Sequence, residues 1–185
     1  MSNGTRMDQY TPSKNALQWG EHYQTDKDYE GMRDFDLRSS IGGPENEGIA
    51  NAISNIMPGY EGELRDMGYS QDDFSSLLQG VAYKESEGGK YDRQHEGGPA
   101  QGWWQVEPNT ARDMVTARHD DGSSNVSNQY WGPKMEAITG FSAQQLYDMD
   151  DEELGATIRD NPKVGAGMAG GKFIKSWRNK ASKGT

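Results

Sequence analysis

Residues 70–86 read Ser-Gln-Asp-Asp-Phe-Ser-Ser-Leu-Leu-Gln-Gly-Val-Ala-Tyr-Lys-Glu-Ser, and they carry the clearest helical pattern in the chain. Ser70 with Asp73 three residues later resembles a capping box, in which side chains bond the free backbone N–H groups at a helix start. The apolar residues that follow recur at the spacing of one helix face: Phe74, Leu77, Leu78, Val81 and Ala82. The stretch therefore predicts a helix that ends at about Glu85, before Gly88-Gly89.

Helical spacing recurs on both sides of this stretch. Ile49, Ile53 and Met57 predict a helix that begins near Pro44, and Pro58-Gly59 is expected to end it. Further helices are expected at 108–118, 133–139, 142–148, 150–159 and 163–178. The last of these has a run of glycines and alanines, which suits a helix packed tightly against a neighbour despite its poor propensity. No long alternating strand pattern occurs, so the sequence predicts a mainly α fold.

The apolar content sets the extent of the folded domain. Only 23 of the 185 residues are Leu, Ile, Val or Phe, so the core must be small and must use Met, Trp, Tyr and Ala. Residues 1–43 hold few core formers and show no periodicity, and such a segment cannot by itself offset its ordering entropy. We expect an extended polar N-terminal arm over 1–43, one domain over 44–178 and a basic tail over 179–185.

Charge and residue types exclude several classes of function. Residues 44–160 carry 22 acidic and 8 basic side chains, which argues against a nucleic-acid partner. The chain has no cysteine, so a disulfide framework, a thiolate zinc site and a cysteine nucleophile are excluded. His22, His95 and His119 do not form a metal-ligand spacing, and no metal is expected. No secretory signal and no membrane span are expected either.

The chemistry is expected to centre on Glu85. The glycine-turned aromatic segment Gly98-Pro99-Ala100-Gln101-Gly102-Trp103-Trp104-Gln105-Val106-Glu107-Pro108 follows it and could fold over the acid. A carboxylic acid surrounded by apolar side chains holds its proton more tightly, and in that state it can protonate a glycosidic oxygen. Pattern alone leaves open an ordinary exposed Glu near a helix end.

The motifs around Glu85 also resemble those of a known protein family. Glu85-Ser86, followed by Pro99, Gly102, Gln105 and Pro108, is similar to the lytic transglycosylase family, which has the goose-type lysozyme-like fold and cleaves peptidoglycan. In that family a Glu-Ser pair ends a helix and precedes a Gly-x-x-Gly-Leu-Met-Gln-x-x-Pro stretch, where this chain has two Trp for Leu-Met. Tyr91-Asp92-Arg93-Gln94 with Gly97-Gly98-Pro99-Ala100 looks most like virion proteins of tailed bacteriophages within the family.

The resemblance implies a role for each matching residue. Glu85 would be the sole catalytic acid and base, and it would cleave the bond between N-acetylmuramic acid and N-acetylglucosamine to give an anhydro-sugar without a metal or cofactor. The substrate would be a peptidoglycan glycan strand. Ser86 and Gln105 would orient the acid or the N-acetyl group of the sugar. Trp103 or Trp104 would line the cleft, and Gly102 completes the expected substrate-binding set.

The resemblance also implies where the protein acts. It would be made in the host cytoplasm, carried in the virion and used on the periplasmic cell wall during genome entry. The N-terminal arm, which the resemblance does not cover, is expected to dock to other virion proteins because it has too few core residues to fold by itself.

Two alternatives stay open. A hydrolytic muramidase would need a base or nucleophile opposite Glu85, and no pattern singles one out among the nearby acids. A structural tail or internal virion protein with a degenerate lysozyme-like domain is the other. One departure supports it: the family shows Asn, then Gly, then an aromatic in a late helix. This chain has Asn161 and glycines but no Tyr at that spacing, which leaves Phe173 as the candidate.

Overall fold

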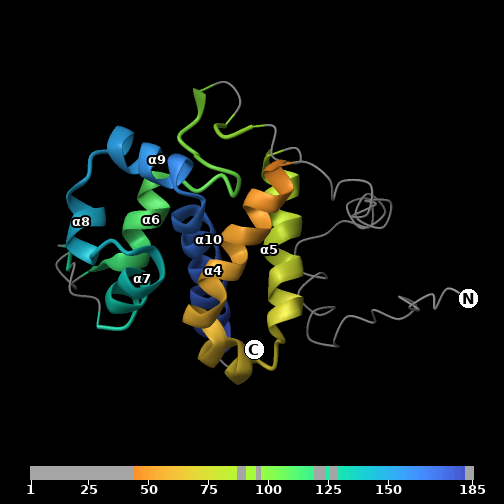
Figure 1. Cartoon of the computed structure of the whole chain (residues 1–185). Helices are drawn as coiled ribbons and strands as arrows, with labels where there is room; N and C mark the ends of the chain where they lie inside the picture. The colour runs from red at the N-terminus through yellow and green to blue at the C-terminus, as the bar shows by residue number, and fades with distance from the viewer. Residues whose placement is uncertain (1–43, 87–90, 95–96, 119–123, 126–128, 182–185) are drawn as a thin grey trace, which may run out of the picture.

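The computed structural model describes residues 44–86, 91–94, 97–118, 124–125 and 129–181, and it confirms a mainly α fold (Figure 1). The expected N-terminal arm, residues 1–43, lies outside the described residues, as do residues 182–185 of the basic tail. The described elements are α4 (Pro44–Met67), α5 (Gln71–Ser86), α6 (Pro108–Val115), β1 (Ala117–Arg118), β2 (Ser124–Asn125), α7 (Trp131–Thr139), α8 (Ala143–Asp148), α9 (Asp151–Asp160) and α10 (Pro162–Ala181). The two short strands pair antiparallel, with Ala117 opposite Asn125.

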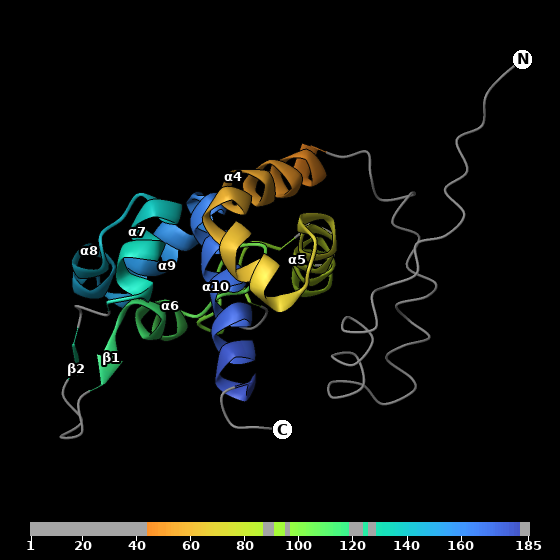
Figure 2. The same ribbon diagram turned by 90° about the horizontal axis from the view of Figure 1, so that it is seen from below.

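Helix α10 lies in the middle of the molecule. In both ribbon views α5 lies on one side of it and α6 to α9 on the other, and α4 packs against it (Figures 1 and 2). Its small residues allow this position. A Cβ at Gly167 would lie 2.8 Å from Ile138 of α7, and one at Gly171 would lie 2.7 Å from Met114 of α6. The expected tightly packed helix is therefore confirmed, because neighbouring side chains occupy the space above its glycines.

Helix α4 does not end at Pro58-Gly59, and that expectation was wrong. The helix continues to Met67 with Pro58 inside it, and it changes direction along its length (Figure 2). Proline removes one helical hydrogen bond and kinks a helix, but it does not have to end one when tertiary packing compensates. Here Tyr60, Leu64 and Met67 continue the apolar face beyond the proline, and all three are buried.

The start of α5 and the end of α6 show how local side chains set helix bounds. The expected capping box is confirmed, because the Ser70 hydroxyl accepts from the Asp73 N–H at 3.0 Å and the Asp73 carboxylate accepts from the Ser70 N–H at 3.2 Å. Helix α6 is shorter than expected and stops at Val115 rather than near Arg118. Thr116 is extended, and both its N–H and its hydroxyl donate to the Arg112 carbonyl, which closes the last turn.

A buried polar cluster joins α4 to α7. Glu63 is only 6% exposed and forms an ion pair with Lys134 at 2.5 Å, while the Tyr130 hydroxyl donates a hydrogen bond to the same carboxylate. Lys134 also donates to the Gly59 carbonyl at 2.7 Å, beside the bend after Pro58. Burial disfavours the charged form of Glu63, but the hydrogen bonds from Lys134 and Tyr130 outweigh it and lower the pKa of this carboxyl. Burial, with the hydrogen bond to Glu63, raises the pKa of Tyr130 to about 12.

Candidate functional site

The segment after α5 folds into a small bridged turn. Gln101 exchanges backbone hydrogen bonds with Val106 at 3.0 and 2.9 Å, and it also bridges to Arg93. The turn is attached to its surroundings through the backbone, because the Gly102 N–H donates to the Asp92 carbonyl at 2.8 Å. Tyr91, at the start of the segment, donates its N–H to the Ser86 carbonyl at the end of α5. Residues 101–106 are therefore held at a fixed place relative to Glu85.

The two indoles of the turn anchor it to the helices. Trp104 is 4% exposed, and its indole N–H donates to the Leu78 carbonyl of α5 at 2.9 Å. Trp103 is half-buried and packs against Gly48 of α4, where an added Cβ would lie 2.5 Å from its ring. Neither indole lines the hollow at Glu85. Trp103 or Trp104 was expected to cover the acid and line the cleft, whereas in the structure Trp104 belongs to the core and Trp103 packs against it.

Two residues of the turn have left-handed backbone conformations. Gly102 has a φ of +70°, and a Cβ there would lie 3.1 Å from the Ile158 carbonyl of α9, so glycine suits both the turn and the close approach. Gln105 has a φ of +46°, which costs a non-glycine residue roughly 1–2 kcal/mol. Its side chain compensates in part, because Nε2 donates to the Gly102 carbonyl at 2.8 Å. Strained residues of this kind cluster at functional sites.

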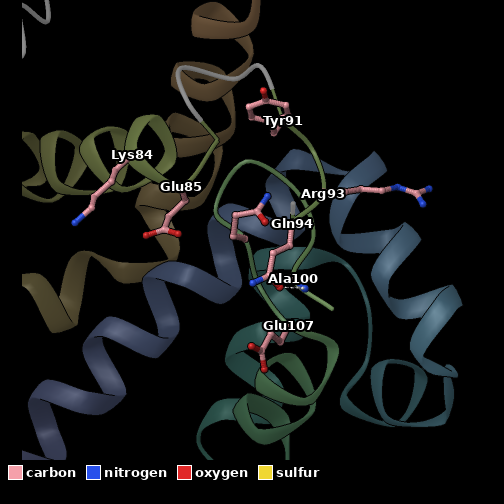
Figure 3. Close-up of a pocket in the computed structure, with 8 residues that line it drawn as sticks. Lys84, Glu85, Tyr91, Arg93, Gln94, Ala100 and Glu107 are labelled. Carbon is pink, nitrogen blue, oxygen red and sulfur yellow. Dashed lines mark hydrogen bonds between the residues drawn. The ribbon is translucent and has the colours of Figure 1, made fainter. Parts of the chain in front are cut away.

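A groove of about 380 Å³ lies between the end of α5 and the bridged turn, and we call it the Glu85 groove (Figure 3). Glu85 lines it, and its side chain is exposed. In Figure 3 the Glu107 carboxylate lies toward the other end of the view, at the start of α6. The groove is lined by Lys84, Glu85, Tyr91, Arg93, Gln94, Ala100, Gln105 and Glu107.

The exposure of Glu85 corrects one expectation. A carboxyl group held between aromatic and aliphatic side chains was expected, but among the described residues of the groove the apolar contribution is limited to Tyr91 and Ala100. Helix α5 turns its buried face elsewhere, with Ala82 and Tyr83 in the core. In the free protein the carboxylate therefore lies at the wall of an open groove and not in a dry pocket.

Ser86 does not line the groove. It is completely buried, and its hydroxyl donates to the Ala82 carbonyl one turn earlier at 2.6 Å. Of the six candidate residues, Glu85 and Gln105 line the groove. The other four belong to the scaffold that fixes the helix end and the turn: Ser86, Gly102, Trp103 and Trp104.

The structure brings to the groove two further polar residues, Gln94 and Glu107, to which the sequence motifs assign no role. Glu107 lies between the bridged turn and α6, is exposed, and makes no side-chain cap hydrogen bond. Gln94 faces the same groove, and its backbone N–H donates to the Ala100 carbonyl at 3.0 Å. The pairing of residues 93–94 with 100–101 places Gln94 here, and the short glycine-rich segment gives no periodicity from which that pairing could be read.

Phe173 does not take the place of the missing tyrosine. Its ring packs against Tyr69 and Phe74, with centroids 6.3 and 5.9 Å apart, near the first turn of α5. Glu85 lies 11 residues further along the same helix, about 16 Å away at a rise of about 1.5 Å per residue. Phe173 therefore does not lie beside Glu85.

The described residues include no group of three or more His, Cys, Asp or Glu side chains placed to hold a metal ion. None of the described helices has the length and apolar character that crossing a bilayer requires.

Comparison of the chain with protein-family models, with curated proteins and with solved structures found no match.

Proposed function

We propose that the chain is a peptidoglycan lytic transglycosylase, with a lysozyme-like domain over residues 44–178. The observation that carries the proposal is the meeting of two motif residues at one groove. Glu85 lies in the last turn of α5 and Gln105 in the bridged turn, twenty residues later in the sequence, and both line the Glu85 groove. These are the positions at which the motif residues match the family.

The proposed reaction has two steps at Glu85. The carboxylic acid first donates its proton to the oxygen between N-acetylmuramic acid and N-acetylglucosamine, and the bond from that oxygen to the muramyl C1 breaks. The muramyl C6 hydroxyl then attacks C1, and the Glu85 carboxylate takes the hydroxyl proton. The products are a free sugar hydroxyl and a 1,6-anhydro end, so the acid is regenerated and no water is consumed.

Because Glu85 is exposed, the bound substrate has to exclude water from it. In the free protein water reaches the carboxylate, so the bound sugar must displace this water before the acid can work in a drier environment. Gln105 is placed to help. Its Nε2 already donates to Gly102, which leaves its carbonyl oxygen to accept a hydrogen bond from the N–H of a sugar acetamido group.

Digestion of purified peptidoglycan, followed by mass spectrometry of the products, tests the activity. Wild-type protein should release muropeptides that end in anhydro-muramic acid. Glu85→Gln keeps the size of the side chain and removes its acid chemistry, so release should fall by at least about 100-fold. An active Glu85→Gln protein would remove Glu85 from its role. A wild-type protein that releases nothing would favour a structural virion protein instead.

Glu107 favours hydrolysis as a second candidate, because it brings another carboxylate to the same groove. A hydrolytic muramidase uses two carboxylates on opposite sides of the scissile bond. The product analysis separates the two chemistries. Hydrolysis gives reducing ends without anhydro-muramic acid and should depend on Glu107, so Glu107→Gln should then lose activity as severely as Glu85→Gln.

We also propose that the protein is carried in a phage virion. This part of the proposal rests on the resemblance of residues 91–94 and 97–100 to tailed-phage virion proteins. Quantitative mass spectrometry of purified particles should find the chain at a fixed number of copies per particle. Its absence from purified particles would contradict the assignment.

A further inference from the structure

A second groove, of about 290 Å³, lies next to the first, and we call it the Glu152 groove. The two grooves meet at Glu107, which lines both. They also share a wall. Gln94 lines the Glu85 groove and Gly98 lines the Glu152 groove, and any Cβ on Gly98 would overlap the Gln94 amide.

The two grooves share a wall because side chains alternate in direction along the extended segment between them. Successive side chains of an extended segment point to opposite sides. Ala100 lines the Glu85 groove, whereas Pro99 and Gln101 on either side of it line the Glu152 groove. A single thin ribbon therefore separates the two hollows, and they join where the ribbon leads into α6.

We propose that the Glu152 groove extends the sugar-binding site, so that an internal stretch of a glycan strand occupies both grooves and is cut away from its ends. This inference rests on the proposed function. A strand bound only in the Glu85 groove would have its last rings in solvent, whereas a strand that passes Glu107 finds a second lined hollow.

The chemistry of the Glu152 groove suits a neutral N-acetylated sugar. The amides of Gln101 and Asn109 can donate to and accept from hydroxyl and acetamido groups, and the carboxylate of Glu152 can accept from hydroxyls. An added Cβ at Gly97 would meet no heavy atom within 4 Å, which leaves room for a bulky ring substituent on that side. The same lining disfavours a polyanionic chain, because its described charged residues are all acidic.

Two neighbouring glutamates give a matched test. Glu152 and Glu153 both lie in the first turn of α9 and are both exposed, but only Glu152 lines the groove. Glu152→Trp should fill the groove, and Glu153→Trp makes the same chemical change outside it. Each is made in the full chain carrying Glu85→Gln, so that bound sugars are not cleaved. Binding of β-1,4-linked N-acetylglucosamine trimers and hexamers is then measured by calorimetry.

The parent protein should bind the hexamer about tenfold more tightly than the trimer. Glu152→Trp should remove that gain and leave trimer binding unchanged, and Glu153→Trp should keep the gain. Equal affinity for trimer and hexamer in the parent protein, or a hexamer preference that Glu152→Trp leaves intact, would overturn the extension of the site and leave the proposed function standing. No binding at either length would overturn both.

As a second readout, wild-type protein acting on peptide-free glycan strands should first give fragments several disaccharides long. Early release of single disaccharides would show that strands are cut from their ends, which contradicts the inference.

Discussion

The placement of Trp104 can be tested by replacing it with phenylalanine. The structure puts this indole in the core, 4% exposed, with its N–H bonded to the Leu78 carbonyl at 2.9 Å. Phenylalanine keeps an aromatic ring but lacks the donor and the larger ring system. Because Trp104 does not touch the Glu85 groove, Trp104→Phe should act on stability first and on sugar binding only weakly.

The size of the effect follows from two losses. Loss of the buried hydrogen bond costs about 1 kcal/mol. The void left by the smaller ring costs roughly another 1–2 kcal/mol, as in other large-to-small changes in a core. The free energy of unfolding should therefore fall by about 2–3 kcal/mol, which lowers Tm by roughly 5–10 °C for a domain of this size. Trp103→Phe is the matched control, and it should cost less than about 1 kcal/mol because Trp103 is only half-buried.

Urea unfolding followed by circular dichroism measures the free energy, and calorimetry with a sugar oligomer measures binding, both on the full chain. The reasoning would be refuted if Trp104→Phe kept the stability of the wild type within about 0.5 kcal/mol and weakened sugar binding instead. That result would put the indole in the groove, where sequence analysis first placed it.

Three further predictions concern other parts of the molecule. Gly167→Ala should destabilise the protein by about 1–3 kcal/mol in urea unfolding, because its Cβ would overlap Ile138. The control Gly80→Ala has open space above it and should stabilise α5 by roughly 0.5–1 kcal/mol. Equal effects of the two substitutions would contradict the packing of α10. The folded-state pKa of Glu63 is lowered, so its ion pair stabilises the protein fully above about pH 5 and progressively less as the pH falls below about 4. Glu63→Gln should therefore make the free energy of unfolding depend less on pH in the acid range. An unchanged pH dependence would count against the ion pair. Gln105→Gly should change the free energy of unfolding by no more than about 1 kcal/mol, since relief of backbone strain offsets one lost hydrogen bond. It should lower peptidoglycan release at least about tenfold. Retained release would exclude Gln105 from substrate binding.

Much of the fold could be predicted because its signals are local. The capping box at Ser70 and the apolar face that follows it give α5 almost to the residue, with an end at Ser86. The end predicted for α4 at Pro58 was wrong because a proline indicates only the local preference of the backbone. Whether the helix continues past it depends on packing against residues more than seventy positions away. Lys134 and Ile138 of α7 both contact the bend at Gly59.

The site was harder to predict than the fold. Motif spacing predicted that Glu85 and Gln105 belong to one site. Both line the Glu85 groove, because the helix end and the turn fix their positions, while their roles stay predictions. The roles of the tryptophans were misjudged because a sequence shows that an aromatic ring is near a site but not which way it faces. The direction of Trp104 is decided by a carbonyl of α5, two turns before Glu85, and no residue type in the turn encodes that partner.

The glycine-rich face of α10 has a consequence for how the chain folds. A helix with so little intrinsic propensity gains its stability from α4, α6 and α7, and these elements in turn close around it. During synthesis α10 therefore emerges after the helices that pack against it, and the apolar faces of those helices stay exposed until residues 162–174 have been made. A fragment that stops before Pro162 should be a substrate for chaperones and proteases rather than a smaller folded unit.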